Sequence, residues 1–379
     1  MGWREEVIPY GSNLCFLSSA EHLIPIVLRF TNVFVKDLSD ANPVTIRIHL
    51  NLETDMKRRE FLACSSSCAA WMLGIAKFSP NGLRSVMQQI DPKREVVIEE
   101  KWGRVEKIEE GVWALVSTPF ESRNFTTVCN GGIIAGDKGV VAVESFMQPK
   151  GAKWWGEVAE KLTGRWPTDV VSTHYHADHT GGHTGYFTDK HKPQVWLTDA
   201  TKTAAEKSFD ERGMDKNDFQ NVMSIDANNG TEIDLGNRKV AIKPRSGHTS
   251  SDVTIELTDP SVVWCGDLFF NRMFPNYGDA IPGRLNEYAW TIKQQDDTVF
   301  VPGHGPIADS NAAAIYSDFL TWIETWARDS IKAGQSVEVA TKDFKLPDEF
   351  KDWLVWAPDN AKKAWVAWER ELKAAEGSS

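Results

Sequence analysis

One short stretch, Thr173–His183, constrains this chain more than any other part of the sequence. It brings three histidines and one aspartate within six positions: His174, His176, Asp178 and His179. Imidazole and carboxylate ligands are typical of catalytic zinc or iron, whereas structural zinc sites are usually rich in thiolates. Two glycines, Gly181 and Gly182, follow where the backbone can turn tightly. The stretch therefore predicts a catalytic metal site.

The residues before this cluster predict where it stands. Residues 168–172 have an apolar, β-branched centre, which indicates a short buried strand that runs out into the cluster. In an extended backbone, successive side chains point to opposite sides, so His174, His176 and Asp178 would project one way and His179 need not. One short loop could then supply two neighbouring metal positions.

Three later residues complete the candidate set: His248, Asp267 and His304. Each of them directly follows a glycine, and each stands near the end of a predicted strand. Side chains at the ends of several strands can converge on one cleft. We therefore expect the early cluster and these three residues to form a single site. We also expect His183 to donate a hydrogen bond to a metal ligand, and His191 to lie in an exposed loop.

The pattern of apolar residues predicts an α/β fold. Strands are expected at 111–116, 127–135, 140–144, 195–197, 232–235 and 240–243, and helices at 153–162 and from about 200. The strands between 111 and 144 read as an antiparallel meander. Strands and helices alternate through two similar halves, which favours two sheets packed together with helices outside.

The sequence becomes helical after His304. Apolar residues at spacings of three and four predict one helix near 315–326, and residues 344–375 predict one or two more that are rich in Trp and Lys. We interpret this region as scaffold packed on the core, without a direct chemical role.

Composition excludes some partners. The formal net charge is −11, and no basic stripe is present, which argues against nucleic acid because phosphate binding depends on clustered Lys and Arg. No apolar run reaches the roughly 18 residues of a membrane span. Composition alone does not identify a partner; the small-molecule substrate that we expect follows from the family resemblance described below.

Residues 56–76 have the layout of an export signal: a charged start, a moderately apolar middle and small residues at the end. The run 57–62, Lys-Arg-Arg-Glu-Phe-Leu, resembles a twin-arginine signal. We therefore expect a periplasmic protein that starts at Met56 and is cleaved before about Lys77, with 1–55 an upstream extension translated in error. A buried amphipathic helix is the alternative. Only Cys129 and Cys265 would then remain, and we expect both to be buried apolar residues.

The order and approximate spacing of the candidate residues resemble the ligand motifs of the metallo-β-lactamase-fold hydrolase superfamily. The resemblance covers about 107–310 and implies a four-layer αββα metallo-β-lactamase sandwich, with 77–106 leading into it and 311–379 as a C-terminal helical extension. It would place His174, His176 and His248 on a first metal and Asp178, His179 and His304 on a second. Asp267 would bridge the two. The run 266–271 further resembles an exported branch, the quinoprotein relay system metallohydrolases.

The chain departs from the superfamily pattern at two positions. The strand that ordinarily ends in a supporting Asp ends here in Glu144, one methylene longer. Asp267 stands where true β-lactamases have Cys or Ser. The second change weakens an antibiotic-hydrolysing interpretation and strengthens the resemblance to glyoxalase II, lactonases and arylsulfatase-like hydrolases.

The resemblance implies two zinc ions, with iron as the alternative. Two such ions, about 3.5–4 Å apart, would lower the pKa of a bridging water to about 7, and Asp178 would orient or deprotonate this water. We therefore expect hydrolysis of an ester, thioester, lactone or β-lactam. The alternatives are a mononuclear iron oxygenase of the persulfide-dioxygenase kind and a non-catalytic periplasmic accessory protein. The loop at 269–284 is expected to select the substrate, which the sequence does not identify.

Overall fold

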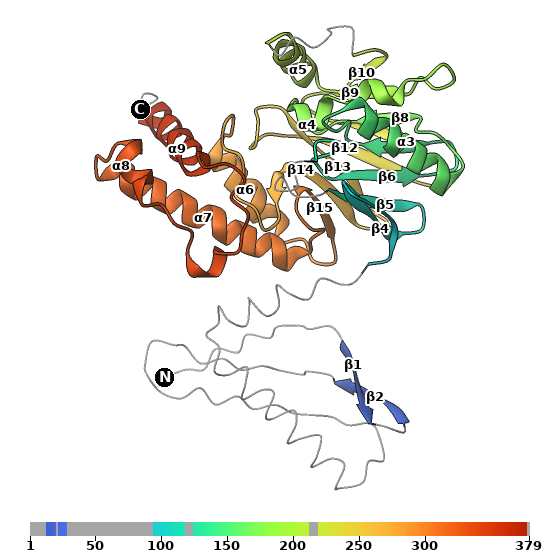
Figure 1. Ribbon diagram of the computed structural model, residues 1–379, viewed down its shortest axis with the longest axis horizontal. Coiled ribbons are helices and arrows are strands. Elements are labelled where there is room, and N and C mark those ends of the chain that lie inside the picture. Colours follow the sequence, from blue (N-terminus) through green and yellow to red (C-terminus); the bar gives the residue numbers. More distant parts are fainter. Residues whose placement is uncertain (1–12, 20–21, 29–93, 118–123, 212–218, 377–379) are drawn as a thin grey trace. The chain divides into compact units, whose positions relative to one another are not determined.

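The computed structural model describes residues 94–117, 124–211 and 219–376, together with the backbone of two short strands nearer the N-terminus (Figure 1). The chain divides into two units, Met1–Leu83 and Arg84–Ser379. In the first unit, β1 (Asn13–Ser19) and β2 (His22–Leu28) form an antiparallel pair. The predicted export signal at 56–76 lies outside the described residues.

The second unit contains an eight-stranded sheet in the order β10-β9-β8-β7-β6-β5-β4-β3. Its strands are β3 (Val96–Glu100), β4 (Gly103–Glu109), β5 (Val112–Ser117), β6 (Gly131–Ala135), β7 (Val140–Val143), β8 (Asp169–Val171), β9 (Gln194–Leu197) and β10 (Val222–Ser224). Strands β3 to β7 pair antiparallel, which confirms the predicted meander, and β7 to β10 pair parallel.

A second sheet has five strands in the order β11-β12-β13-β14-β15. They are β11 (Thr231–Asp234), β12 (Lys239–Arg245), β13 (Asp252–Leu257), β14 (Val262–Phe270) and β15 (Val299–His304). The last two pair parallel, and the register shifts at Gly266. A parallel pair needs a crossover, and here α6 (Pro282–Ile292) provides it.

Helices cover the outer face of each sheet (Figure 1). Beside the first sheet lie α3 (Pro149–Thr163), α4 (Ala177–Thr180), the 3-10 turn η2 (His183–Tyr186) and α5 (Asp199–Glu211). Beside the second lie α6, α7 (Ser310–Lys332), α8 (Val337–Lys342), η4 (Asp348–Phe350) and α9 (Asn360–Glu376). No helix among the described residues is long and apolar enough to cross a membrane.

Three apolar clusters show the four layers. Ile133 packs towards Trp155 of α3, whereas its neighbour Ile134 packs between the sheets. On the second sheet, Trp264 points into the inner cluster and Val263 points to the layer of α6, α7 and α9. Consecutive residues of one strand are thus buried on opposite faces of its sheet. The αββα sandwich expected from the sequence is confirmed.

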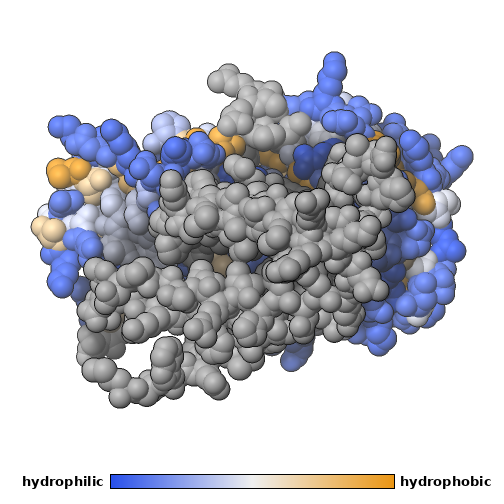
Figure 2. Space-filling view, turned by 90° about the horizontal axis from the view of Figure 1, so that it is seen from below, coloured by the Kyte–Doolittle hydropathy of each residue, from blue (hydrophilic) through white to orange (hydrophobic). Residues whose placement is uncertain are grey.

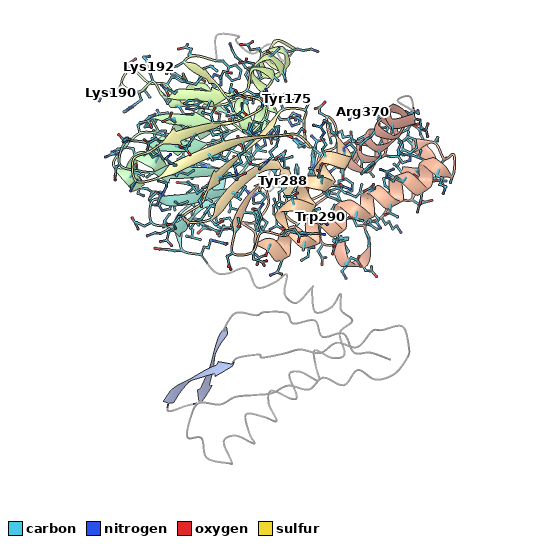
Figure 3. The ribbon with its side chains drawn as sticks, turned by 180° about the vertical axis from the view of Figure 1, so that it is seen from behind. Tyr175, Lys190, Lys192, Tyr288, Trp290 and Arg370 are labelled. Atoms are coloured by element: carbon cyan, nitrogen blue, oxygen red, sulfur yellow. The ribbon has the colours of Figure 1, made fainter. Side chains whose placement is uncertain are left out.

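The outer surface that Figure 2 leaves uncovered by grey atoms is mostly hydrophilic, with small hydrophobic patches. Large exposed apolar side chains among the described residues are scattered, and Trp290 on α6 is one of them (Figure 3). The free cysteines Cys129 and Cys265 are buried, as predicted. The apolar side chains of this unit are therefore mostly used in its core.

Trp264 joins the two sheets at the centre of the sandwich. Its indole nitrogen donates to the carbonyl of Gly131 at 3.2 Å, and its ring lies against Gly132 so closely that a Cβ there would overlap it. We predict that Gly132→Ala lowers the free energy of unfolding by about 2–3 kcal/mol, because an overpacked core must shift. Urea denaturation followed by circular dichroism measures this.

The matched control is Gly278→Ala, whose Cβ would meet its nearest neighbour at an ordinary 3.4 Å. We expect this variant to unfold close to the wild-type midpoint. Equal stability of the two variants would contradict the proposed close contact at Trp264.

Candidate metal centre

The seven predicted ligands come from separate elements that end at the same edge of the sandwich. Their positions are as follows: His174 and His176 after β8, Asp178 and His179 in α4, His248 after β12, Asp267 in β14, and His304 at the end of β15. The structure brings their ligand atoms into two adjoining groups. Within each group these atoms lie within 4.8 Å of one another.

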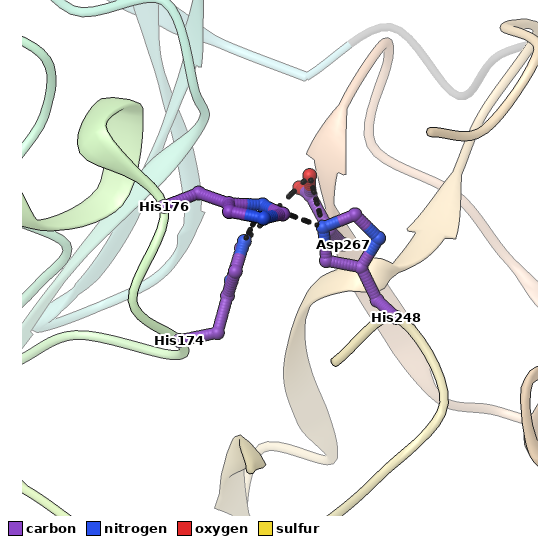
Figure 4. A group of neighbouring side chains, drawn as sticks. All are labelled: His174, His176, His248 and Asp267. Carbon is purple, nitrogen blue, oxygen red and sulfur yellow. Dashed lines mark hydrogen bonds and ion pairs between the residues drawn. The ribbon is translucent and has the colours of Figure 1, made fainter. Parts of the chain in front are cut away.

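The first group contains His174, His176, His248 and Asp267 (Figure 4). His176 Nδ1 lies 3.0 Å from His174 Nε2 and 2.9 Å from His248 Nε2. Asp267 Oδ2 lies 3.3 Å from His248 Nε2. Three ring nitrogens and one carboxylate oxygen therefore converge on one point.

The second group contains Asp178, His179 and His304. Asp178 Oδ2 lies 3.4 Å from His179 Nε2 and 3.2 Å from His304 Nε2. The other oxygen of Asp267, Oδ1, lies 3.2 Å from His179 Nε2 and 3.3 Å from His304 Nε2. The Asp267 carboxylate thus presents one oxygen to each group.

These separations fit a divalent cation in each group. Four donors at about 2.0–2.1 Å around a tetrahedral zinc ion would lie about 3.3–3.4 Å from one another. In addition, one imidazole nitrogen cannot satisfy two other ring nitrogens at hydrogen-bond distance, as His176 Nδ1 would have to. Two buried atoms at the second group, His179 Nε2 and the Asp267 Oδ1 that faces it, have no hydrogen-bond partner. A cation satisfies all these atoms at once.

The surroundings of these side chains also favour the protonation states in which they bind metal. It lowers the pKa of His174 well below its usual value, and it lowers that of His248 to about 3, so both rings are neutral. Burial alone would raise the pKa of Asp267, but the surrounding imidazoles outweigh it and hold this pKa well below the usual range. Neutral imidazole and ionised carboxylate are the forms that bind metal.

The second group has a different charge balance. Burial lowers the pKa of His304, but the carboxylates of Asp267 and Asp178 outweigh burial and raise it to about 9. The pKa of His179 is raised in the same way, by Glu144 and the two aspartates among others. Two buried carboxylates thus favour positive charge at this place, which a divalent cation would supply.

Glu144 holds the first part of the motif in position. This buried residue has a left-handed φ of 76°. Its Oε1 accepts from the Thr173 hydroxyl at 2.6 Å and lies 3.0 Å from His179 Nδ1, while Oε2 accepts from the Thr173 amide at 3.2 Å. The Thr173 hydroxyl is in turn 3.0 Å from His174 Nδ1. Glu144 therefore lies where the predicted supporting residue should be, despite its extra methylene.

Asp267 fits its place because of a glycine on the neighbouring strand. A Cβ on Gly303 would overlap Asp267 Oδ1, so only glycine there leaves room for the carboxylate. The register shift at Gly266 turns the chain just before Asp267. The glycine before His304 is thus explained by the space that Asp267 needs, and the glycine before Asp267 by the register shift.

Two expectations about this region were wrong. Residues 177–180 form a helical turn, α4, so Asp178 does not project with His174 and His176 as an extended backbone predicts, but joins His179. His191 is half-buried and stacks on Trp166 at 4.9 Å instead of lying exposed.

His183 also differs from its predicted role. Its Nδ1 lies 3.0 Å from the Thr180 carbonyl, and its ring stacks on Phe219 at 4.4 Å. Within the described part of the chain, none of the seven candidate ligands is a hydrogen-bond partner of His183. It therefore packs behind α4 and does not donate to a ligand.

Sequence reasoning missed two carboxylates beside the rings. Asp279 Oδ2 lies 3.0 Å from His176 Nε2, the nitrogen that faces away from the first group. Asp252 accepts from the backbone amides of His248 and Thr249, and burial raises its pKa to about 7. Neither belongs to a motif, although Asp279 lies within the loop 269–284 that was expected to select the substrate.

A cleft of about 830 Å³ opens above the two groups. His176, Asp178, Asp267 and His304 line its floor. Its walls include Lys207 of α5 and, from the C-terminal region, Trp356 and Lys363. The C-terminal region packs on the core as expected of scaffold, and two of its residues also line the cleft above the candidate site.

Comparison with known proteins relates this arrangement to a large family. The family model of the metallo-beta-lactamase superfamily matches residues 125–305, the part that carries all seven ligands. A metallo-beta-lactamase type 2 from Bacillus sp. (strain 170) is 28% identical over 245 residues, covering 62% of this chain and 90% of that protein. One from Bacillus cereus is 26% identical over 249 residues, covering 63% and 90%.

Among solved structures, the fold is similar to that of the stereoselective inverting sec-alkylsulfatase Pisa1 from Pseudomonas sp. The TM-score is 0.56 at 15% sequence identity, and the match covers 71% of this chain and 50% of that chain. This likeness supports the sandwich fold.

The contact between Asp279 and His176 leads to a prediction. A carboxylate that accepts from the outer nitrogen of a ligand histidine fixes its tautomer and ring orientation. We expect Asp279→Asn to weaken zinc binding at the first group by about 10–100-fold. Competition with a chromogenic chelator measures the affinity.

The control is Asp296→Asn, which removes a charge from an exposed turn away from the cleft. We expect it to bind zinc as the wild type does. Unchanged zinc affinity in the Asp279 variant would show that the contact does not position His176.

Proposed function

We propose that this chain, which contains a metallo-beta-lactamase superfamily domain, is a metal-dependent hydrolase that cleaves an ester, thioester, lactone or β-lactam. The observation that carries the proposal is the Asp267 carboxylate, which faces a group of ligands with each oxygen. A centre of this kind would hold two cations in one cleft. When bound, they supply hydroxide at neutral pH and polarise the scissile carbonyl.

The candidate ligands are assigned to the two proposed cations by their positions. His174, His176 and His248 would hold one cation, and Asp178, His179 and His304 the other, with Asp267 shared. Zinc is the proposed metal, since imidazole and carboxylate donors at tetrahedral separations suit it. Iron is the alternative, and one iron with oxygen consumption would indicate the oxygenase reaction instead.

Asp178 is the proposed catalytic residue. It lines the cleft, its side chain is 16% exposed, and its Oδ2 lies near both His179 and His304. The imidazoles hold its pKa well below the usual range despite burial, so the carboxylate is ionised and can accept a hydrogen bond from the attacking water. Its place at the floor of the cleft lets it orient that water towards the substrate carbonyl.

Two observations bear on which kind of bond the proposed hydrolase cleaves. Asp267 stands where the sequence pattern of β-lactamases has Cys or Ser, which favours an ester, thioester or lactone. The two Bacillus relatives carry the name metallo-beta-lactamase type 2, which keeps a β-lactam among the candidates. A small-molecule substrate fits the cleft volume of about 830 Å³.

The hydrolase proposal predicts a joint loss of metal and activity. We expect His248→Ala and Asp267→Ala to lower kcat/KM by about 100-fold or more, equivalent to at least ~2.7 kcal/mol of transition-state stabilisation. The assay is a panel of thioester, lactone, aryl ester and cephalosporin substrates. Metal content is measured on the same preparations.

His191→Ala is the matched control, because this histidine stacks on Trp166 and is not among the seven. It should retain both metal and turnover. Wild-type rates in either ligand variant would refute the assignment of these residues.

We also propose export to the periplasm, on the basis of the twin-arginine run at 57–62. Twin-arginine signals serve proteins exported in folded form, which suits a protein that acquires its metal before export. Replacing Arg58 and Arg59 with Lys should retain the protein in the cytoplasm, as cell fractionation would show. Lys57→Arg is the control and should not affect export. Unchanged export of the double variant would overturn this proposal.

A further inference from the structure

We propose that the cleft selects substrates with an anionic group beside a planar part, and that Lys363, Lys207 and Trp356 recognise these two features. The inference rests on the proposed hydrolase function and names the class of its substrate. All three side chains line the same cleft as Asp178 and Asp267. Two of them come from the C-terminal region, outside the part that the family model matches.

Trp356 provides a fixed flat surface. Its indole nitrogen donates to the carbonyl of Phe274 at 3.1 Å, which holds the ring at the wall of the cleft. The ring is partly buried and lines the cleft. A planar or apolar group can lie on it at a small cost in conformational entropy, because the tryptophan is already positioned.

Lys363 places a positive charge next to this surface. Its ammonium lies 5.2 Å from the centre of the Trp356 ring, and its side chain is 33% exposed. It also lies 3.3 Å from Asp359 Oδ2, one turn earlier in the same helix. An exposed pair of this kind is weak, so it holds the ammonium in place without preventing a stronger contact with a ligand anion.

The helix that carries Lys363 is anchored to the loop that forms the neighbouring wall. The Arg370 guanidinium donates to the Ala280 carbonyl, and Glu371 Oε2 accepts from the Gly283 amide at 3.1 Å. Figure 3 shows Arg370 on this helical layer and Tyr175 on the sandwich. The lysine therefore has a defined position relative to the candidate metal centre.

The cleft carries charges of both signs, and its lysines are the groups that could bind an anion. The carboxylates of Asp178 and Asp267 face the ligand imidazoles, and Asp279 contacts His176. Lys207 of α5 adds a second ammonium to the wall. The whole chain has a net charge of −11, so its overall field repels anions, and within the cleft only a group close to Lys207 or Lys363 would be attracted.

These positions indicate how a substrate would lie in the cleft. Its scissile carbonyl would lie at the floor, near Asp178 and Asp267, and its planar part against Trp356. A carboxylate or sulfate at the far end would reach the ammonium groups. The C-terminal region and α5 would thus select the substrate together, while the strand ends and α4 provide the candidate metal ligands.

The test compares two aryl acetates of nearly equal size and with one ester bond each, the anion 4-acetoxybenzoate and the neutral 4-acetoxybenzamide. We measure kcat/KM for both with metal-loaded enzyme and take the ratio of anionic to neutral. We expect a ratio above one in the wild type. Lys363→Gln and Lys207→Gln should each lower it by about three- to fivefold, the size expected for partly exposed charge pairs, mainly through KM. The effects should shrink as salt is added.

Matched controls lie on the same two helices. Lys362→Gln on α9 and Lys202→Gln on α5 remove the same charge from lysines that do not line the cleft, and they should leave the ratio unchanged. A wild-type ratio near one, or equal effects of cleft and control variants, would overturn the inference.

A binding measurement separates this inference from the hydrolase proposal. Calorimetry with 4-hydroxybenzoate and the neutral 4-hydroxybenzamide, neither of which has an ester bond, gives the charge preference on the same metal-loaded proteins without ester turnover. If neither ester is hydrolysed, ester cleavage is refuted, and the binding ratio still decides the role of the lysines. Weaker binding of the anion in Lys363→Gln and Lys207→Gln supports it, and equal binding of both ligands by all variants refutes it.

Discussion

The contact on which the rest of the site depends is that of the buried Asp267 carboxylate with two groups of histidines at once. Isolated buried charge is costly, and this one is tolerated because ring nitrogens lie 3.2–3.3 Å from its two oxygens. Those rings come from both sheets, so the carboxylate can be satisfied only when the sheets are correctly packed. The inner apolar cluster around Trp264 therefore supports the geometry of the site as well as the stability of the fold.

Carboxylates outside the seven candidate ligands hold the rings in place by three different routes. Glu144 contacts His179 directly and His174 through Thr173, Asp252 accepts from the backbone of His248, and Asp279 contacts the outer nitrogen of His176. Such contacts fix tautomer and orientation, which determine whether a lone pair points at a common centre. The left-handed φ of Glu144 is explained in the same way, since a strained backbone persists where its surroundings determine it.

The sequence was sufficient for the parts of this site that depend on residue type and local order. Histidine and aspartate at close spacing, and glycine beside each later candidate, predicted which residues come together, and alternating strands and helices predicted the sandwich. The helical turn at 177–180 was not predictable from alternation, because it depends on contacts such as that of Glu144 with His179. Asp279 was missed because a lone carboxylate in a loop has no pattern, and only folding brings it to His176.

The C-terminal helices show why an apolar pattern typical of scaffold does not reveal which residues line a cleft. Their apolar faces pack on the outer cluster of the second sheet, so periodicity alone indicates scaffold. Yet the partly exposed rim of that packing, Trp356 and Lys363, closes one side of the cleft. A residue at such a rim can change without disturbing either the apolar face or the metal ligands. Substrate selection can therefore vary in this layer while the sheets keep the catalytic geometry, since the two depend on different side chains.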